Sequence, residues 1–321
     1  MASKMASLRH VTKISSLSRA EIVGVLDMAI DMKASPLRYA DALKQKSLLM
    51  LFEKPSLRTR VSLEVGMTQL GGHAIAYMTG DSPLGKKETY EDTGAVLSRM
   101  VDAVTARVGT RAQIAGLAQN STVPIINALD DAAHPMQMLA DLQTLAEHKF
   151  GGNALSLVDG GLKFAFVGDC QNNVTYDLMR ACAIMGIDCR VAGPPGADFA
   201  IEDGVLEECE QLGAGRVKVC GTAEEAVSGV DAIYCDSWMS YGIAGDAKAK
   251  RLAALMPFQV TASLMKLADK SAVFMNCLPA MRGEEQTAEV IDGPQSIVFD
   301  QAENRLHAQK ALLVKLINGG L

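Results

Sequence analysis

The sequence contains no apolar run that approaches the roughly 18 residues needed to span a bilayer. It has no basic stretch interleaved with aromatic residues, and its net charge of −6 argues against general nucleic-acid binding. We therefore expect neither a membrane nor a nucleic acid as a partner. With 321 residues, 49% of them hydrophobic and 21% charged, the chain is typical of a globular protein of two domains.

The seven cysteines all lie at or after Cys170, and they form no CxxC pair and show no zinc spacing. An odd number of cysteines in a chain of this size, without a secretory signal, is typical of a reducing compartment. The first twenty residues are basic and contain no acid, as in a transit peptide, but Ser18-Arg19-Ala20-Glu21-Ile22 already predicts a capped helix start. We expect no bound metal and a cytoplasmic location, with an organelle left open.

Predicted strands and helices alternate along the chain. The strands are expected at 47–52, 73–78, 102–106, 123–128, 162–168, 187–192, 216–220, 231–235 and 272–276. The principal helices are expected at 18–32, 56–70, 87–100, 111–119, 135–148 and 300–317, and the glycine-rich stretch 149–161 is the candidate link. This order predicts the α/β class, with two doubly wound parallel-sheet domains. In such sheets ligands bind beyond the carboxyl ends of strands, so residues at strand ends are the candidates for function.

The stretch from Phe52 to Arg60 carries a chemical signal of this kind. Ser56 is a good N-cap, so a helix is expected to start there, directly after a buried strand. Arg58 and Arg60 then lie in the first turn, where the helix dipole is already positive. An anion held by the free N–H groups, Ser56, Thr59 and the arginines would offset this repulsion. The alternative is a solvated arginine pair on an ordinary helix start.

Further candidates follow other predicted strands. Arg107 ends one strand, and His134 follows the next, with Gln137 on the same face of the helix that it opens. Asp236 ends a strand in the second half, where it could bind a cation or simply cap a helix. Cys277 could be a nucleophile or a small packed side chain.

The segment Gly168-Asp169-Cys170-Gln171-Asn172-Asn173 begins like a dinucleotide-binding turn. It lacks the second and third glycines of G-x-G-x-x-G, so we do not expect a nicotinamide cofactor, or any other.

Together these motifs resemble the aspartate/ornithine carbamoyltransferase family over nearly the whole chain. Phe52-Glu53-x-x-Ser56-x-Arg58-Thr59-Arg60, Arg107 and His134-Pro135-x-Gln137 are similar to the family's carbamoyl phosphate motifs. Asp236-x-Trp238-x-Ser240-x-Gly242, Cys277-Leu278-Pro279 and Ala302-Glu303-Asn304-Arg305 resemble the ornithine branch.

The resemblance implies direct attack by the side-chain amine of ornithine on carbamoyl phosphate, giving citrulline and phosphate. It implies a carbamoyl phosphate-binding domain at 1–148, an ornithine-binding domain at 149–299, a C-terminal helix at about 300–321 that packs back on the first domain, and a homotrimer. The residues implied for carbamoyl phosphate are Ser56, Leu57, Arg58, Thr59, Arg107, His134, Gln137, Cys277, Leu278 and Arg305. Those implied for ornithine are Asn173, Asp236, Ser240 and Tyr241, and catalytic roles fall to Arg107, His134, Asp236 and Cys277.

The sequence departs from the ornithine branch at four positions. Tyr241 stands in place of Met, Asn276 in place of His, Met281 in place of a polar residue, and Pro83 in place of Gln or His. Two alternative functions therefore stay open: a sister enzyme acting on putrescine or an acylated ornithine, and a non-catalytic binding protein. Asp236 and Ser240, which suit a free α-amino group, argue against the first alternative. The second would be expected to lack Arg58, Arg107 or His134.

Overall fold

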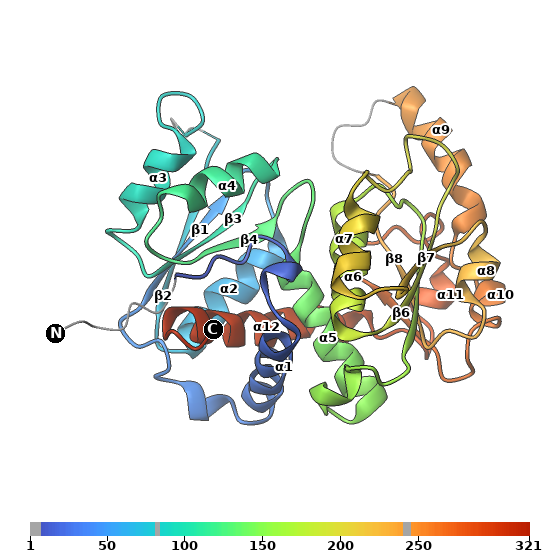
Figure 1. Cartoon of the computed structure of the whole chain (residues 1–321), viewed down its shortest axis with the longest axis horizontal. Coiled ribbons are helices and arrows are strands. Elements are labelled where there is room, and N and C mark those ends of the chain that lie inside the picture. The colour runs from blue at the N-terminus through green and yellow to red at the C-terminus, as the bar shows by residue number, and fades with distance from the viewer. Residues whose placement is uncertain (1–7, 81–83, 240–244) are drawn as a thin grey trace. The chain divides into compact units, whose positions relative to one another are not determined.

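Helices and parallel strands alternate through the computed structural model, which describes residues 8–80, 84–239 and 245–321 (Figure 1). Contacts between Cα atoms divide the chain into two compact units. Unit 1 comprises Met1–Ala154 and Glu303–Leu321, and unit 2 comprises Leu155–Ala302. Among the described residues, no helix is long and apolar enough to cross a membrane.

Unit 1 contains a four-stranded parallel sheet in the order β2-β1-β3-β4. Its strands are β1 (Ser47–Phe52), β2 (His73–Met78), β3 (Ala103–Arg107) and β4 (Ile125–Leu129). The helices of this unit are α1 (Arg19–Ala34), α2 (Leu57–Gln69), α3 (Tyr90–Leu97), α4 (Arg111–Gln119), α5 (Pro135–Phe150) and most of α12 (Val298–Ile317). Helices α3 and α4 cover one face of the sheet, and α1, α2 and α12 lie on the other side (Figure 1).

Unit 2 contains a five-stranded parallel sheet in the order β7-β6-β5-β8-β9. Its strands are β5 (Lys163–Val167), β6 (Asp188–Ala192), β7 (Val217–Val219), β8 (Ala232–Cys235) and β9 (Val273–Asn276). Its helices are α6 (Asn173–Met185), α7 (Val205–Leu212), α8 (Ala223–Val227), α9 (Gly245–Leu255), α10 (Ala262–Met265) and α11 (Ala288–Ile291). Helices α8, α10 and α11 pack on one face, and α6 and α7 lie on the other (Figure 1). Short 3₁₀ helices lie at Ile14–Ser16, Pro36–Tyr39, Ala154–Leu157 and Met256–Phe258.

The predicted fold class, two parallel α/β domains, is confirmed, and local capping explains where individual helices begin and end. Ser18 accepts from the N–H of Glu21 at 3.3 Å, and the Glu21 carboxylate accepts from the N–H of Ser18 at 2.7 Å, so the predicted capping box starts α1. The helix predicted at 87–100 is shorter, because Thr89 caps it by accepting from the N–H of Asp92 at 3.1 Å. Gly151, in the left-handed conformation, ends α5.

A buried asparagine fixes the C-terminal helix on unit 1, as the resemblance implied. The Asn304 amide nitrogen donates to Thr144 Oγ1 and Glu147 Oε2, both at 2.9 Å. Its carbonyl oxygen accepts from Lys33 Nζ at 2.9 Å and from Gln143 Nε2 at 3.1 Å. A fully satisfied buried amide of this kind sets the register of a helix, because any slip would leave several polar groups unpaired.

Each sheet reverses its strand order once, between β1 and β3 in unit 1 and between β5 and β8 in unit 2. In open parallel sheets, ligands bind beyond the carboxyl ends of the strands at such a switch point. The segments that follow these four strands, together with those after the neighbouring strands β4 and β9, carry the candidate site residues.

The contact between α3 and α4 generates a stability prediction. A Cβ atom added at Gly94 would lie 2.2 Å from the backbone oxygen of Leu117, so Gly94→Ala must push the helices apart. We expect a loss of about 1–3 kcal/mol in the free energy of unfolding, typical of overpacking. The matched control is Gly24→Ala inside α1, where the nearest obstacle is the mobile end of Lys315, with Nζ at 3.3 Å. Thermal unfolding should show a lower midpoint for Gly94→Ala only, and equal midpoints for the two variants would contradict this packing.

Candidate functional site

The first group of candidate residues lies beyond the carboxyl ends of β1 and β3 in unit 1. Ser56 is the N-cap residue of α2, as predicted, but its side chain makes no capping hydrogen bond. Arg58 and the buried Thr59 lie in the first turn of this helix. Arg107 is the last residue of β3 and pairs with Phe52 across the sheet. A helix start with a serine hydroxyl not used in capping, and with arginines beside it, is suited to an anion such as phosphate.

Arg305 of α12 is buried near this helix start and is held by neutral partners. Its Nη1 donates to Gln137 Oε1 at 2.7 Å, and its Nη2 donates to Thr59 Oγ1 at 3.1 Å. With its amide oriented to satisfy its neighbours, Gln309 accepts from Arg305 Nη2 and Nε at 2.9 Å each and donates to Ser62 Oγ at 2.8 Å. Because these three partners are uncharged, they fix the guanidinium without cancelling its charge.

His134 is placed at the start of α5 by a tight turn after β4. Asp130 Oδ1 accepts from the N–H groups of Ala132 and Ala133 at 2.7 and 2.8 Å, which closes this turn. Pro135 occupies the first helical position, as predicted, so the helix starts directly after the histidine.

The surroundings of His134 keep its imidazole neutral. Burial lowers its pKa well below the ordinary value of 6.5, and the positive charges of Arg305, Arg107 and Arg58 lower the pKa further. Hydrogen bonds from Arg305 to Gln137, on the helix that His134 opens, and to Thr59, beside Arg58, bring these cations into one region of unit 1. A neutral imidazole there can donate a hydrogen bond to a carbonyl oxygen without adding another charge.

Sequence reasoning missed two members of this group. Asp141 accepts from Gln137 Nε2 at 2.8 Å and so orients the glutamine carbonyl toward Arg305. Gln309 lies one turn after Arg305 and braces the guanidinium. The spacing of four residues on one helix face, 137 to 141 and 305 to 309, was the available signal for both.

The second group lies beyond the carboxyl ends of β8 and β9 in unit 2. The Cys277 thiol donates to Asp236 Oδ1 at 2.9 Å, and the same oxygen accepts from the N–H of Ser237 at 2.7 Å. Asp236 and Cys277 are partly exposed, whereas the other six cysteines are buried. Because the thiol keeps its proton to donate to a carboxylate, Cys277 is better suited to orienting a ligand than to attacking one as a nucleophile.

Asn276, a departure from the ornithine branch, holds the backbone beside Cys277. Its Oδ1 accepts from the N–H of Leu278 at 2.7 Å, and its Nδ2 donates to Gln286 Oε1 at 3.3 Å. Leu278 adopts a φ of 56°, an uncommon conformation for a residue with a side chain. The amide of Asn276 therefore fixes this strained turn with a group that does not titrate.

Asn173 opens α6 after β5, beside a buried ion pair. Asp169 pairs with Arg251 of α9, and Arg251 Nε also donates to the carbonyl oxygen of Trp238 at 2.7 Å. Burial raises the pKa of Asp169 to about 6, and the nearby carboxylate of Asp236 also raises it. These contacts tie the loop after β5 to the loop after β8, where Asn173 and Asp236 lie.

Several expected residues are not part of these groups. Ser240, Tyr241 and Pro83 lie outside the described residues. Arg60 forms an ion pair with Glu64, one turn further along α2, at 2.9 Å, so its side chain points away from the start of the helix. The Leu57 side chain is 75% exposed, which leaves only its backbone N–H as a candidate ligand group.

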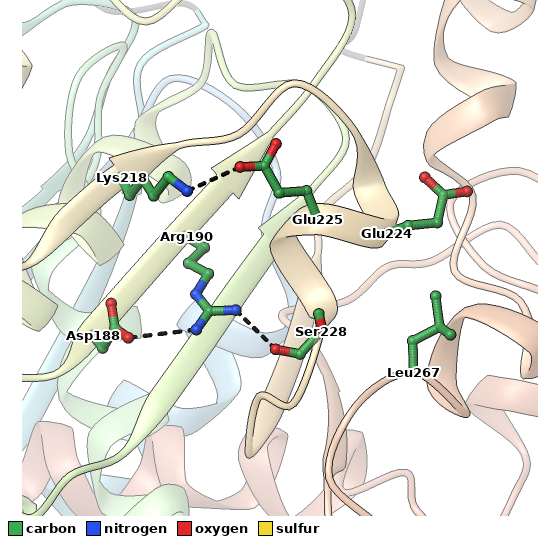
Figure 2. A pocket seen from close by; sticks show the side chains of 7 residues that line it. All are labelled: Asp188, Arg190, Lys218, Glu224, Glu225, Ser228 and Leu267. Carbon is green, nitrogen blue, oxygen red and sulfur yellow. Dashed lines mark hydrogen bonds and ion pairs between the residues drawn. The ribbon is translucent and has the colours of Figure 1, made fainter.

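A hollow of about 740 Å³ in unit 2 contains none of the candidate residues and is lined by Asp188, Arg190, Lys218, Glu224, Glu225, Ser228 and Leu267 (Figure 2). Figure 2 shows its basic side chains already engaged: Lys218 with Glu225 at 2.9 Å, and Arg190 with Asp188 and the backbone of Ser228. We therefore do not count this hollow as a candidate ligand site, because its basic side chains already bind acceptors within the chain. In the described parts of the chain, no cluster of three or more His, Cys, Asp or Glu residues could hold a metal ion.

Two family models match most of the chain. The aspartate/ornithine carbamoyltransferase, carbamoyl-P binding domain matches residues 9–147, and the aspartate/ornithine carbamoyltransferase, Asp/Orn binding domain matches residues 160–316.

Known proteins resemble the chain over nearly its whole length. The catabolic ornithine carbamoyltransferase of Halobacterium salinarum is 44% identical over 313 residues, which cover 97% of this chain and 100% of that protein. The solved ornithine transcarbamoylase of Giardia lamblia is 45% identical, with a TM-score of 0.88 over 97% of this chain and 98% of that one. The ornithine carbamoyltransferase of Pyrococcus furiosus is 42% identical, with a TM-score of 0.89 over 98% of each chain. Since identity and fold extend through both units, the chain belongs to the aspartate/ornithine carbamoyltransferase family.

Proposed function

We propose that this protein transfers the carbamoyl group of carbamoyl phosphate to the side-chain amine of L-ornithine, giving L-citrulline and phosphate. The observation that carries the proposal is the arrangement of Arg58, Arg107 and His134 at the carboxyl ends of β1, β3 and β4, with the buried Arg305 tied to it by donating to Thr59 at 3.1 Å and to Gln137 at 2.7 Å. The relatives' names, and the carboxylate–thiol pair at the switch point of unit 2, support ornithine as the acceptor.

On this proposal, unit 1 binds the anionic donor. Ser56, Arg58, Arg107 and the N–H groups that begin α2 bind the phosphate. Thr59, Arg107 and His134 face the carbonyl oxygen, on which negative charge grows during attack. Gln137, Arg305, Cys277 and Leu278 remain our proposed contacts of the carbamoyl end. Fixed donors of this kind lower the barrier without a covalent intermediate.

The amine side of the reaction is assigned to unit 2. Asp236 matches the ammonium group of ornithine, and Asn173 can donate to its carboxylate, with Ser240 and Tyr241 as further proposed contacts. The neutral amine attacks the carbamoyl carbon, the bond from that carbon to the phosphate oxygen breaks, and the proton lost from nitrogen leaves with phosphate. Cys277, already donating to Asp236, is placed to help orient the amine and is not required to attack.

We also propose a homotrimer, supported by an apolar surface on unit 1. The α2 residues Leu57, Val61 and Val65, spaced by four, are 75%, 49% and 40% exposed. On the edge strand β2, Ile75 and Tyr77, which lie on the same face of the strand, are each 41% exposed. Exposed apolar residues gathered on one helix and an adjoining sheet edge are typical of surfaces between subunits.

For location we propose a reducing compartment such as the cytoplasm. All seven cysteines are free thiols, and none forms a disulfide. This pattern is common where glutathione and thioredoxin keep thiols reduced.

The assay that tests the proposal supplies carbamoyl phosphate with L-ornithine, putrescine, N-acetylornithine or L-aspartate. We expect citrulline from ornithine and negligible product from aspartate, whose second carboxylate would be repelled by Asp236. Faster turnover of putrescine than of ornithine would assign the protein to a sister activity instead.

Arg107→Lys tests the proposed oxyanion contact. Lysine keeps the positive charge but lacks the planar guanidinium, which can donate two hydrogen bonds to one partner. We therefore expect kcat to fall about 10²- to 10³-fold, with weaker carbamoyl phosphate binding as well. Steady-state kinetics with each substrate varied in turn measure both effects. A rise in KM alone would reassign Arg107 to ground-state binding.

The pH dependence tests the neutral histidine. Because the pKa of His134 is lowered below 6.5, its imidazole stays neutral above that pH. The ornithine amine, with a pKa of about 10, is mostly protonated at neutral pH, so kcat/KM for ornithine should rise about tenfold per pH unit from about pH 7 to 9. An additional acid limb above pH 6.5 that disappears in His134→Gln would show that the imidazole is charged.

A further inference from the structure

A hydrogen-bonded cluster in unit 1 joins the segment between β1 and α2, just before Arg58, to the segment that follows Arg107 at the end of β3. We call it the Glu53 cluster, and its members are Glu53, Tyr90, Gly109 and Gln113. Glu53 Oε2 accepts from the N–H of Gly109 at 2.7 Å. Glu53 Oε1 accepts from the Tyr90 hydroxyl at 2.7 Å and from Gln113 Nε2 at 2.5 Å. Gln113 Nε2 also donates to the Tyr90 hydroxyl oxygen.

The cluster connects the loops on both sides of the switch point. Glu53 follows β1 and precedes the helix start at Ser56 by three residues, and its own N–H donates to the carbonyl oxygen of Arg107 at 2.9 Å. Gly109 follows Arg107 by two residues. The backbone of Glu53 therefore binds the last residue of β3, and its side chain binds the segment just after it. A Cβ atom at Gly109 would lie 3.3 Å from Glu53 Oε2, which shows how closely the carboxylate approaches this loop.

Tyr90 supplies the donor from a third element. It is the first residue of α3, and its ring packs against the core beneath α3 and α4. Burial, followed by the hydrogen bond to Glu53, raises the pKa of Tyr90 to about 12, so the phenol stays protonated and donates throughout the working range. The Gln113 carbonyl oxygen accepts from the N–H of Thr110 at 2.8 Å, which extends the cluster to the start of α4.

We propose that Tyr90 is a positioning residue for the anion site: through Glu53, its hydroxyl fixes the start of α2, which bears Arg58, relative to the end of β3, which bears Arg107. Tyr90 itself touches no substrate in this role. The inference rests on the proposed function, since it takes the bound anion to be the phosphate of carbamoyl phosphate. Two arginines bind a phosphate tightly only when both guanidinium groups are held at the correct spacing. A small displacement of either segment therefore weakens the affinity for phosphate.

The test is Tyr90→Phe, which removes the hydroxyl and keeps the ring in the core. We expect KM for carbamoyl phosphate and the dissociation constant of inorganic phosphate to rise together by about 3- to 10-fold, the effect of one lost hydrogen bond to a carboxylate. KM for ornithine should be unchanged. Gln113→Leu, which removes the second donor to Glu53 Oε1, should act in the same direction.

Tyr39→Phe is the matched control. The Tyr39 hydroxyl donates to Asp31 Oδ2 at 2.5 Å in the same unit, so this variant also loses one phenol–carboxylate hydrogen bond, but from the segment after α1. We expect its phosphate affinity to equal that of the wild type. Thermal midpoints of both variants separate a loss of stability from a loss of anion affinity. If Tyr90→Phe lowered only the midpoint, as a purely structural tyrosine would, the positioning role would be overturned.

Titration with inorganic phosphate, followed by calorimetry, separates this inference from the proposed function. A wild-type protein that binds phosphate but forms no citrulline would refute the proposed acceptor, while the comparison of Tyr90→Phe with Tyr39→Phe would still decide the role of Tyr90. A protein that transfers carbamoyl groups with unchanged phosphate affinity in Tyr90→Phe would refute the positioning role alone. Absence of phosphate binding by the wild type would overturn both.

Discussion

The gathering of several arginines at one end of a parallel sheet is the constraint on which unit 1 depends. Like charges repel, and burial of Arg305 adds a desolvation cost, so the arrangement needs neighbours that hold each guanidinium without neutralising it. Gln137, Thr59 and Gln309 do this for Arg305, because amide and hydroxyl groups satisfy its donors and leave its charge in place. The remaining positive field suits a doubly charged phosphate group. Burial, and after it this field, lowers the pKa of His134 and so keeps its imidazole neutral.

Unit 2 presents the opposite chemistry at its own switch point. Asp236 supplies a carboxyl group there, and the neighbouring Asp169 has its pKa raised to about 6 by burial, with Arg251 opposing that shift. A carboxylate beside a thiol donor is suited to an ammonium or amine ligand, while the cationic edge of unit 1 is suited to an anion. The two units therefore divide the recognition of the proposed substrates by charge, in agreement with the two domain models that the family matches provide.

Both candidate groups depend on polar side chains that touch no proposed ligand. The Glu53 cluster holds the segments next to Arg58 and Arg107, Asp141 orients Gln137, and Asn276 fixes the turn at Leu278. Each of these groups is an amide, a carboxylate or a phenol that forms hydrogen bonds with other groups of the protein. Such groups hold loops more rigidly than apolar packing does, because a displaced polar group would be left unpaired in the interior.

The sequence by itself determined the alternation of strands and helices, the start of α2 at Ser56 and the residues that end β3 and begin α5, because periodicity and capping are local properties. Its motifs also identified Arg58, Arg107, His134, Asp236 and Cys277 as candidates. The tertiary structure alone decided that the thiol of Cys277, which follows β9, donates to Asp236, which follows β8. It alone joined Glu53 to Tyr90 and Gln113, 37 and 60 residues further along the chain. Such contacts depend on the strand order of the sheet and on burial, and neither of these can be read from neighbouring residues in the sequence.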